Sequence, residues 1–225
     1  MSAEMKKTRQ ILMPESFLSG PLPGKASHLK MAPFSRRDSL MMENKIPQDA
    51  KVSAVLVLLV QSCDECSVLF IKRSDNTGVH SGQIAFPGGK KEKSDRNFME
   101  TALRETQEEL GIRDGIEVIG ELTPLYVPPS NFVIHPVLAV ATKREEILSS
   151  IRTCESEVCD YKLIPLSRFT NNENIKHKEF KTSYFDNENA PYYEIDDYHI
   201  WGATAMILSE LIDAISSSHF RHLRG

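Results

Sequence analysis

The run KVSAVLVLLVQ at residues 51–61 constrains the fold of this chain more than any other feature. Its apolar centre, from Ala54 to Val60, is far too short for a membrane-spanning helix, which needs about 20 apolar residues. A short apolar run of this kind instead predicts a strand. The sequence SVLFIKR at residues 67–73 follows the turn residues CDEC, so we expect it to pair with the first strand as a hairpin.

The segments downstream alternate between strand and helix patterns. We expect strands within residues 116–127, 132–142 and 156–166, a hairpin at 180–196, a short helix near 144–151, and main helices at 94–110 and 201–216. Ser94 or Asp95 can cap the first main helix, and Gly111 can end it. The segment SGQIAFPGGK predicts a short strand that ends where Pro87–Gly89 breaks regular structure. Together these elements predict the α/β class, as an α/β/α sandwich with a mixed β-sheet between helices.

Residues 1–48 show no sustained period of 2 or 3.6 and contain the turn-forming sequence GPLPG at 20–24. We therefore predict an N-terminal extension over residues 1–48, with one short helix at most, before a single domain over residues 49–225. The extension can wrap around the domain or contact a partner, and the sequence leaves both possibilities open.

The net charge of −4 shows no basic excess, so we expect no nucleic-acid partner. The N-terminus does not resemble a signal peptide, so we predict a soluble, cytoplasmic protein without a membrane partner. The four cysteines, Cys63, Cys66, Cys154 and Cys159, are too few for the disulfide framework of a secreted protein. Their C-x2-C and C-x4-C spacings leave a zinc site as the alternative to reduced thiols.

Three glutamates, Glu105, Glu108 and Glu109, fall at i, i+3 and i+4 of the predicted helix. Like charges at these spacings repel by a few tenths of a kcal/mol per pair. On a helical wheel, Glu109 lies at the edge of the apolar face and is expected to be half-buried. Arg104 is the only cation in the sequence between 101 and 112, so the pattern differs from a salt-bridged surface. We therefore predict a hard divalent cation, for which carboxylate oxygens are natural ligands. The apolar face comprises Phe98, Met99, Ala102, Leu103 and Leu110.

A Gly-Gly pair at 88–89 precedes this helix, and glycine lets a backbone carbonyl approach a metal or phosphate closely. Together these residues resemble the Nudix box of the Nudix hydrolases, G-x5-E-x7-R-E-U-x-E-E-x-G-U, where U is bulky and apolar. This chain has Gly89, five residues, Asp95, eight residues, and then Arg104–Ile112. It departs from the pattern in three ways, because Asp95 replaces Glu, one extra residue precedes the arginine, and Thr106 replaces a bulky apolar residue.

A longer pattern resembles the coenzyme A pyrophosphatase branch of this family, which carries L-L-T-x-R-S-x3-R-x3-G-x3-F-P-G-G before the box. Here Leu69–Ser74, Gly82 and Phe86–Gly89 match the spacing, whereas Gly78 stands where the second arginine is usual. The C-terminal stretch IWGATA is also similar to that branch. The resemblance covers about residues 50–215.

The resemblance implies Mg²⁺- or Mn²⁺-dependent hydrolysis of a nucleoside diphosphate linked to another group. Coenzyme A would yield phosphopantetheine and adenosine 3′,5′-bisphosphate. The resemblance also implies that Glu105, Glu108 and Glu109 hold the metal together with the Gly88 carbonyl, and that Glu105 is a candidate for activating water.

Other residues receive roles from the same resemblance. Arg104 is expected to orient the carboxylates, because its position on the wheel points away from Glu109. Glu157 is a further candidate base or metal ligand, with an ordinary glutamate at a strand edge as the alternative. The implied substrate-binding residues are Lys72, Arg73, Gly82 and Phe86; for Lys72 and Arg73 a solvated strand end is the alternative.

Two other functions remain open at this stage. Gly78 favours a Nudix hydrolase with a different small-molecule substrate, such as ADP-ribose or NADH. A non-catalytic module that senses a nucleotide is the other, although the three intact glutamates favour an enzyme. By analogy with the superfamily, a homodimer is possible. The preferred metal, the general base and the role of the extension are left open.

Overall fold

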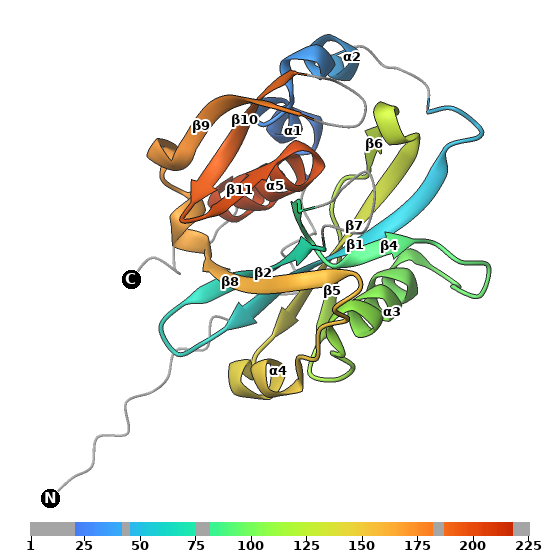
Figure 1. Cartoon of the computed structure of the whole chain (residues 1–225), viewed down its shortest axis with the longest axis vertical. Helices are drawn as coiled ribbons and strands as arrows, with labels where there is room; N and C mark the ends of the chain where they lie inside the picture. Colours follow the sequence, from blue (N-terminus) through green and yellow to red (C-terminus); the bar gives the residue numbers. More distant parts are fainter. Residues whose placement is uncertain (1–20, 42–45, 75–81, 182–186, 218–225) are drawn as a thin grey trace, which may run out of the picture.

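A computed structural model describes residues 21–41, 46–74, 82–181 and 187–217 (Figure 1). Gly78, the departure from the coenzyme A pattern, lies outside these residues. The helices are α1 (Lys25–Lys30), α2 (Arg37–Met41), α3 (Phe98–Leu110), α4 (Arg144–Ser150) and α5 (Gly202–Ser217). The strands are β1 (Lys51–Gln61), β2 (Cys66–Arg73), β3 (Ile84–Ala85), β4 (Gly88–Lys90), β5 (Glu117–Glu121), β6 (Leu125–Val127), β7 (Phe132–Ala141), β8 (Val158–Pro165), β9 (Ile175–Phe180), β10 (Glu188–Ile195) and β11 (Tyr198–Trp201).

Within the described residues, eight strands form one mixed sheet. β1 and β7 run parallel along ten paired positions, from Lys51 opposite Phe132 to Val60 opposite Ala141. The other pairs are antiparallel: β1 pairs with β2 and β4, β7 with β5 and β6, and β2 with β3 and β8. The predicted hairpin of β1 and β2 is therefore confirmed.

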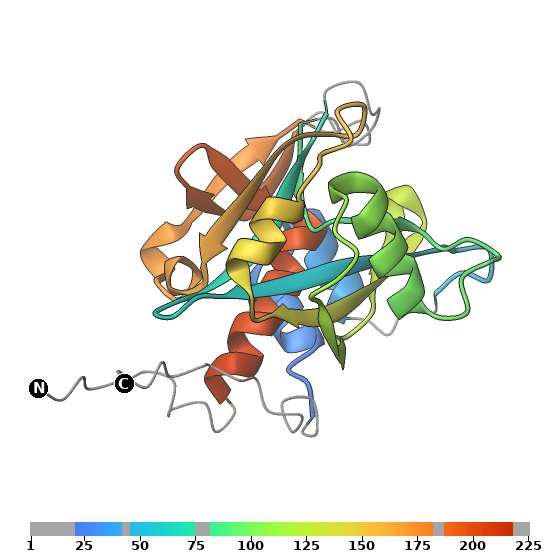
Figure 2. The same ribbon diagram turned by 90° about the horizontal axis from the view of Figure 1, so that it is seen from below.

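The side chains of β1 alternate between the two faces of the sheet. Leu56 and Leu58 join a buried cluster with Ala102 and Leu110 of α3 and Ile147 of α4. Val57 and Leu59, which alternate with them, join a second cluster, which contains the apolar face of α5 and residues of β10 and β11. The sheet thus lies between α3 and α4 on one side and α5 on the other (Figure 2), which confirms the α/β/α sandwich.

Helix α3 begins later than predicted. The side chain of Asn97, not Ser94 or Asp95, caps it by accepting a hydrogen bond from the amide of Glu100 at 2.9 Å. The predicted stop is confirmed, because Gly111 adopts the left-handed conformation that favours glycine, with φ of 74°. The predicted apolar face is wrong at Met99, whose side chain remains 38% exposed in the first turn.

The expected break at Pro87–Gly89 is also wrong in part. β3 ends at Ala85, but Gly88 and Gly89 belong to β4 and pair with Val55 and Ala54 of β1. A β-carbon on Gly88 would lie 2.4 Å from the Ala54 carbonyl oxygen. Only glycine allows the two backbones to come this close, so the pair serves sheet pairing rather than a turn.

The hairpin predicted at residues 180–196 exists as the antiparallel pair of β9 and β10, but its first strand lies earlier than predicted, at Ile175–Phe180. Residues 182–186 of the predicted range lie outside the described residues. The sequence did not predict that β11 would add to β10 and make a separate three-stranded sheet. This sheet packs beside the start of α5 (Figure 1).

The described part of the N-terminal extension contains two short helices, α1 and α2, so the prediction of one is wrong. It packs against the domain, with α1 beside α5 (Figures 1 and 2). Buried Glu210 of α5 accepts hydrogen bonds from the Gly24 amide at 3.1 Å and from the amide and hydroxyl of Thr123. It also lies 3.0 Å from His28 Nε2. One carboxylate thereby joins α1, α5 and the segment before β6. Among the described helices, none has the length and apolar character needed to cross a membrane.

We predict that Glu210→Ala lowers the free energy of unfolding by about 3 kcal/mol, because several buried donors lose their acceptor. Urea unfolding at neutral pH measures the effect. Glu179→Ala, which truncates an exposed glutamate of β9, is the matched control and is expected to stay within about 0.5 kcal/mol of the unmodified chain. Equal stability of the two variants would show that this carboxylate does not hold the extension.

Candidate active site

The carboxylate face of α3 lies against the glycine strand β4. A β-carbon on Gly89 would lie 2.3 Å from Glu105 Oε2, so the backbone of this strand touches the glutamate directly. The Gly88 amide donates a hydrogen bond to Glu109 Oε2 at 2.9 Å. Packing of α3 on β1 and β4 therefore brings the two glycines and two of the predicted ligands together.

Glu109 is the most enclosed of the three glutamates. It is 1% exposed, deeper than the half-buried position predicted from the wheel, because β4 covers it. Arg73 Nη1 lies 3.5 Å from Glu109 Oε1. Burial raises the pKa of Glu109 to about 7, an effect that the Gly88 amide and Arg73 oppose and the charges of Glu105 and Glu157 reinforce. A carboxylate in this state is poised to exchange a proton for a cation.

Arg104 connects the remaining carboxylates. Its Nη1 lies 2.9 Å from Glu105 Oε1 and 3.1 Å from Glu108 Oε2. Its Nε and Nη2 donate to the two oxygens of Asp95 at 3.1 and 3.0 Å. The positive charge of this guanidinium offsets the repulsion between Glu105 and Glu108. Its contacts with three carboxylates are those that the predicted orienting role of Arg104 requires.

Asp95 replaces the usual glutamate of the box and is buried. Besides Arg104, it accepts hydrogen bonds from the Thr101 hydroxyl at 3.0 Å and the Glu92 amide at 2.9 Å. These bonds, that with Arg104 foremost, hold the pKa of Asp95 well below its usual range. With both oxygens engaged, Asp95 positions Arg104 in this conformation.

Glu157 is exposed on the segment that leads into β8, and its charge raises the pKa values of Glu105 and Glu109. For Glu105, burial is the larger cause of the raised pKa. The backbone holds this segment in place, because the Ser74 amide donates to the Glu157 carbonyl at 2.9 Å. The structure thus places this predicted base near the helix carboxylates.

The four predicted substrate-binding residues separate in the structure. Arg73 lies beside Glu109, whereas Lys72 is adjacent on β2 and its charge acts on Asp197 in the turn before β11. Adjacent residues of a strand point to opposite faces, so Lys72 lies away from the carboxylates. The Gly82 amide bonds to the Arg73 carbonyl at 3.1 Å and supports that strand end.

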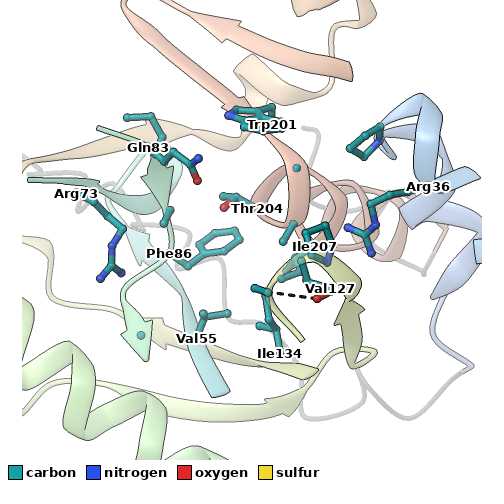
Figure 3. Close-up of a pocket in the computed structure, with 18 of the residues that line it drawn as sticks. Arg36, Val55, Arg73, Gln83, Phe86, Val127, Ile134, Trp201, Thr204 and Ile207 are labelled. Atoms are coloured by element: carbon teal, nitrogen blue, oxygen red, sulfur yellow. Dashed lines mark hydrogen bonds between the residues drawn. The ribbon is translucent and has the colours of Figure 1, made fainter. Parts of the chain in front are cut away.

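Phe86 lines a cavity of about 220 Å³ that adjoins the carboxylates through Arg73 and Gly88 (Figure 3). Many of the lining residues were not predicted from the sequence, among them Arg36, Glu188 and Trp201. For Trp201 the stretch IWGATA is a usable signal, because it is similar to the coenzyme A pyrophosphatase branch. No comparable pattern surrounds Arg36 or Glu188.

The donor set fits a hard divalent cation in its chemistry, with three carboxylates on one helix face and one of them buried. The set is not assembled in this conformation, because no three acidic, histidine or cysteine side chains in the described part of the chain converge on one point. Arg104 holds Glu105 and Glu108 instead. Glu108 is 55% exposed, so a cation that binds it has to displace Arg104 but not a packed side chain.

Comparison with known proteins gives consistent matches. Residues 50–184 match the family model described as the NUDIX domain. The chain is 32% identical over 212 residues to a probable nudix hydrolase of Schizosaccharomyces pombe, covering 89% of this chain and 71% of the relative. It is 34% identical over 157 residues to the human mitochondrial coenzyme A diphosphatase NUDT8, covering 69% of this chain and 65% of that protein. It is 30% identical over 176 residues to an uncharacterized Nudix hydrolase, NudL, of Yersinia enterocolitica, covering 73% and 81%.

We predict that Mn²⁺ binding releases a proton at pH 6 and much less at pH 8.5. The raised pKa of Glu109 means that the free protein holds this proton below about pH 7, and a cation must displace it. Calorimetric titration in buffers of different ionisation enthalpy measures the release. Glu109→Gln is expected to abolish it, whereas Glu145→Gln, an exposed glutamate of α4, retains it. Equal release at both pH values would contradict the assignment.

We also predict that Asp95→Asn lowers the free energy of unfolding by about 1 to 3 kcal/mol at pH 7. Because the folded-state pKa of Asp95 is lowered, its stabilisation is present above the unfolded value near 3.8 and is lost as the pH falls toward the folded value. The difference between the variant and the unmodified chain should therefore shrink below pH 4 in denaturant titrations. Asp114→Asn, at an exposed position, should show neither effect.

Proposed function

The chain belongs to the Nudix hydrolase family, and on that basis we propose that it cleaves the diphosphate of coenzyme A or an acyl-CoA. The products are phosphopantetheine and adenosine 3′,5′-bisphosphate. One observation carries this proposal: the face with Glu105 and Glu109 adjoins, through Gly88 and Arg73, a cavity that can receive part of a substrate. A diphosphate placed beside Arg73 would lie next to these carboxylates.

The choice of coenzyme A is supported by two features. The residues from Leu69 to Gly89 follow the coenzyme A pattern apart from Gly78, and a relative at 34% identity is a mitochondrial coenzyme A diphosphatase. ADP-ribose or NADH is the alternative substrate. Gly78 favours this alternative, because the coenzyme A pattern has at that position an arginine that could pair with a phosphate, and this chain lacks it. A nucleotide-sensing module without activity is the remaining alternative.

Nudix hydrolases generally use divalent metal ions, and we propose Mg²⁺ or Mn²⁺ for this chain. Glu105, Glu108 and Glu109 would hold the ion, with the Gly88 carbonyl as a further ligand. When bound, the ion would supply neutralisation of the diphosphate charge. Arg73 adds a positive charge at the same edge of the site and can pair with a phosphate oxygen.

The reaction adds water to one phosphorus and breaks the bond to the bridging oxygen, which leaves with the other phosphate. Glu105 is the first candidate to accept the proton of this water, because burial and neighbouring carboxylates raise its pKa. Glu157 is the second candidate, since it is exposed near the same carboxylates. Arg104 acts as a positioning residue for Glu105 and Glu108.

We predict that the chain releases adenosine 3′,5′-bisphosphate from coenzyme A in the presence of Mn²⁺ or Mg²⁺, and that a chelator stops the reaction. Glu108→Gln is expected to lower kcat at least about 100-fold, since it removes a carboxylate from the proposed metal ligands. Chromatography of the products from coenzyme A, ADP-ribose, NADH and diadenosine polyphosphates measures the activity. Glu145→Gln is the matched control and should retain full activity.

Each outcome of this experiment is decisive for a different part of the proposal. Preferential cleavage of another dinucleotide would reject coenzyme A and retain the metal-dependent hydrolase. An unchanged rate in Glu108→Gln would reject the proposed ligand set. The absence of turnover with every compound, despite Mn²⁺ binding, would favour the nucleotide-sensing module.

A further inference from the structure

The N-terminal extension contributes to the cavity beside the carboxylates. Pro33, which precedes the 3₁₀ turn Phe34–Arg36, and Arg36, which ends it, both line the cavity. Arg36 lies at the end far from Arg73 (Figure 3). The volume of about 220 Å³ is below the roughly 300 to 1,000 Å³ of pockets that enclose a whole ligand. The cavity therefore has room for one arm of a substrate.

Arg36 is held rigidly although it lies outside the predicted domain. It is 8% exposed, and its Nη2 donates to the Tyr126 carbonyl at 2.6 Å. Nη1 lies 3.7 Å from the sulfur of Met206. Burial lowers the pKa of Arg36 to about 10 and the charge of Glu188 opposes this shift, so the guanidinium stays protonated at neutral pH.

Glu188 supplies the opposite charge at the same end of the cavity. It is 6% exposed and accepts a hydrogen bond from the Ser35 hydroxyl at 2.7 Å. The end is therefore polar, with a donor and an acceptor whose charges compensate each other. The walls between this end and Gly88 are mostly apolar, with polar side chains from Gln83, Ser130 and Thr204; the apolar residues include Val55, Ile84, Phe86, Val127, Ile134 and Ile207.

We propose that this cavity binds the non-nucleotide arm of the substrate and that Arg36 is a specificity-determining residue at the end far from Arg73. The inference rests on the proposed function, because it takes the diphosphate to lie beside Arg73. An aliphatic chain with amide groups fits both the walls and the end: an amide carbonyl can accept from Arg36, and an amide N–H can donate to Glu188. In coenzyme A this arm is pantetheine.

A second phosphate is the less suitable occupant. The apolar walls would remove water from its charges, and the carboxylate of Glu188 would repel it. The 3′-phosphate and adenine of coenzyme A are therefore placed outside the cavity. A guanidinium has five N–H donors, so Arg36 can bond to the Tyr126 carbonyl and to a ligand together.

Steady-state kinetics with coenzyme A and dephospho-coenzyme A tests this assignment, because the second compound lacks the 3′-phosphate but keeps pantetheine. Arg36→Met is expected to raise KM by the same factor, about tenfold, for both substrates, because the substrate arm loses a hydrogen bond to a charged group. Arg37→Met removes the same side chain from the next residue, which contacts Phe34 and does not line the cavity. This control should leave both KM values unchanged.

Three results would overturn the inference. A KM that rises only for coenzyme A would show that Arg36 binds the 3′-phosphate, and an unchanged KM for both substrates would show that the cavity is not used. If neither substrate is cleaved, the proposed function fails, and calorimetry with phosphopantetheine decides the cavity separately. Phosphopantetheine binding that is weaker in Arg36→Met would support the proposed role of the cavity. A lack of phosphopantetheine binding to the unmodified chain would reject that role.

A second variant covers the case in which Arg36→Met does not fold, which thermal unfolding will reveal. Thr204 of α5 lines the cavity (Figure 3), whereas Glu105, Glu108 and Glu109 are not among its lining residues. Thr204→Phe fills the space from the other side and is expected to raise KM for both substrates to a similar extent. Unchanged KM values in this folded variant would equally overturn the inference.

Discussion

The hydrogen bond from the Gly88 amide to the buried carboxylate of Glu109 is the contact on which the site depends. It exists because β4 lies on β1 at a distance that only glycine permits, which brings a backbone donor under α3. The bond partly compensates the burial of Glu109 and fixes the helix on the sheet. Arg73, at the end of β2, then adds a side-chain charge to the same carboxylate.

The repulsion among the glutamates is reduced in two ways, one for the glutamates near the surface and one for the buried glutamate. At the surface, Arg104 pairs with Glu105 and Glu108, and Asp95 holds its guanidinium in place. In the interior, Glu109 lies beyond that pairing and keeps a raised pKa instead. In this conformation the carboxylates are therefore held apart, and a cation would have to compete with Arg104 for two of them and with a proton for the third.

The sequence predicted the parts of this structure that follow from local patterns. The apolar run of β1, the hairpin with β2, the stop at Gly111 and the face of α3 that packs on the sheet all rest on short-range periodicity or backbone conformation. The predicted start of α3 was wrong, because the side chain of Asp95 accepts a hydrogen bond from Arg104 and the side chain of Asn97 caps the helix instead. Lys72 and Arg73 looked equivalent in the sequence, and only the pleat of β2 separates them.

The extension shows the limit of such prediction most clearly. Composition separated residues 1–48 from the rest, but its described part is attached to the domain. Met31 and Ala32 join the buried core, and polar contacts link Ser27 and Lys30 to Asp213 and Ser35 to Glu188. Polar contacts of this kind leave no period in a sequence, whereas a packed apolar face does. Arg36 ends the 3₁₀ turn that follows these contacts, and it lines the cavity. A boundary drawn from composition therefore excludes a residue that borders the site, and removing the extension would open the cavity.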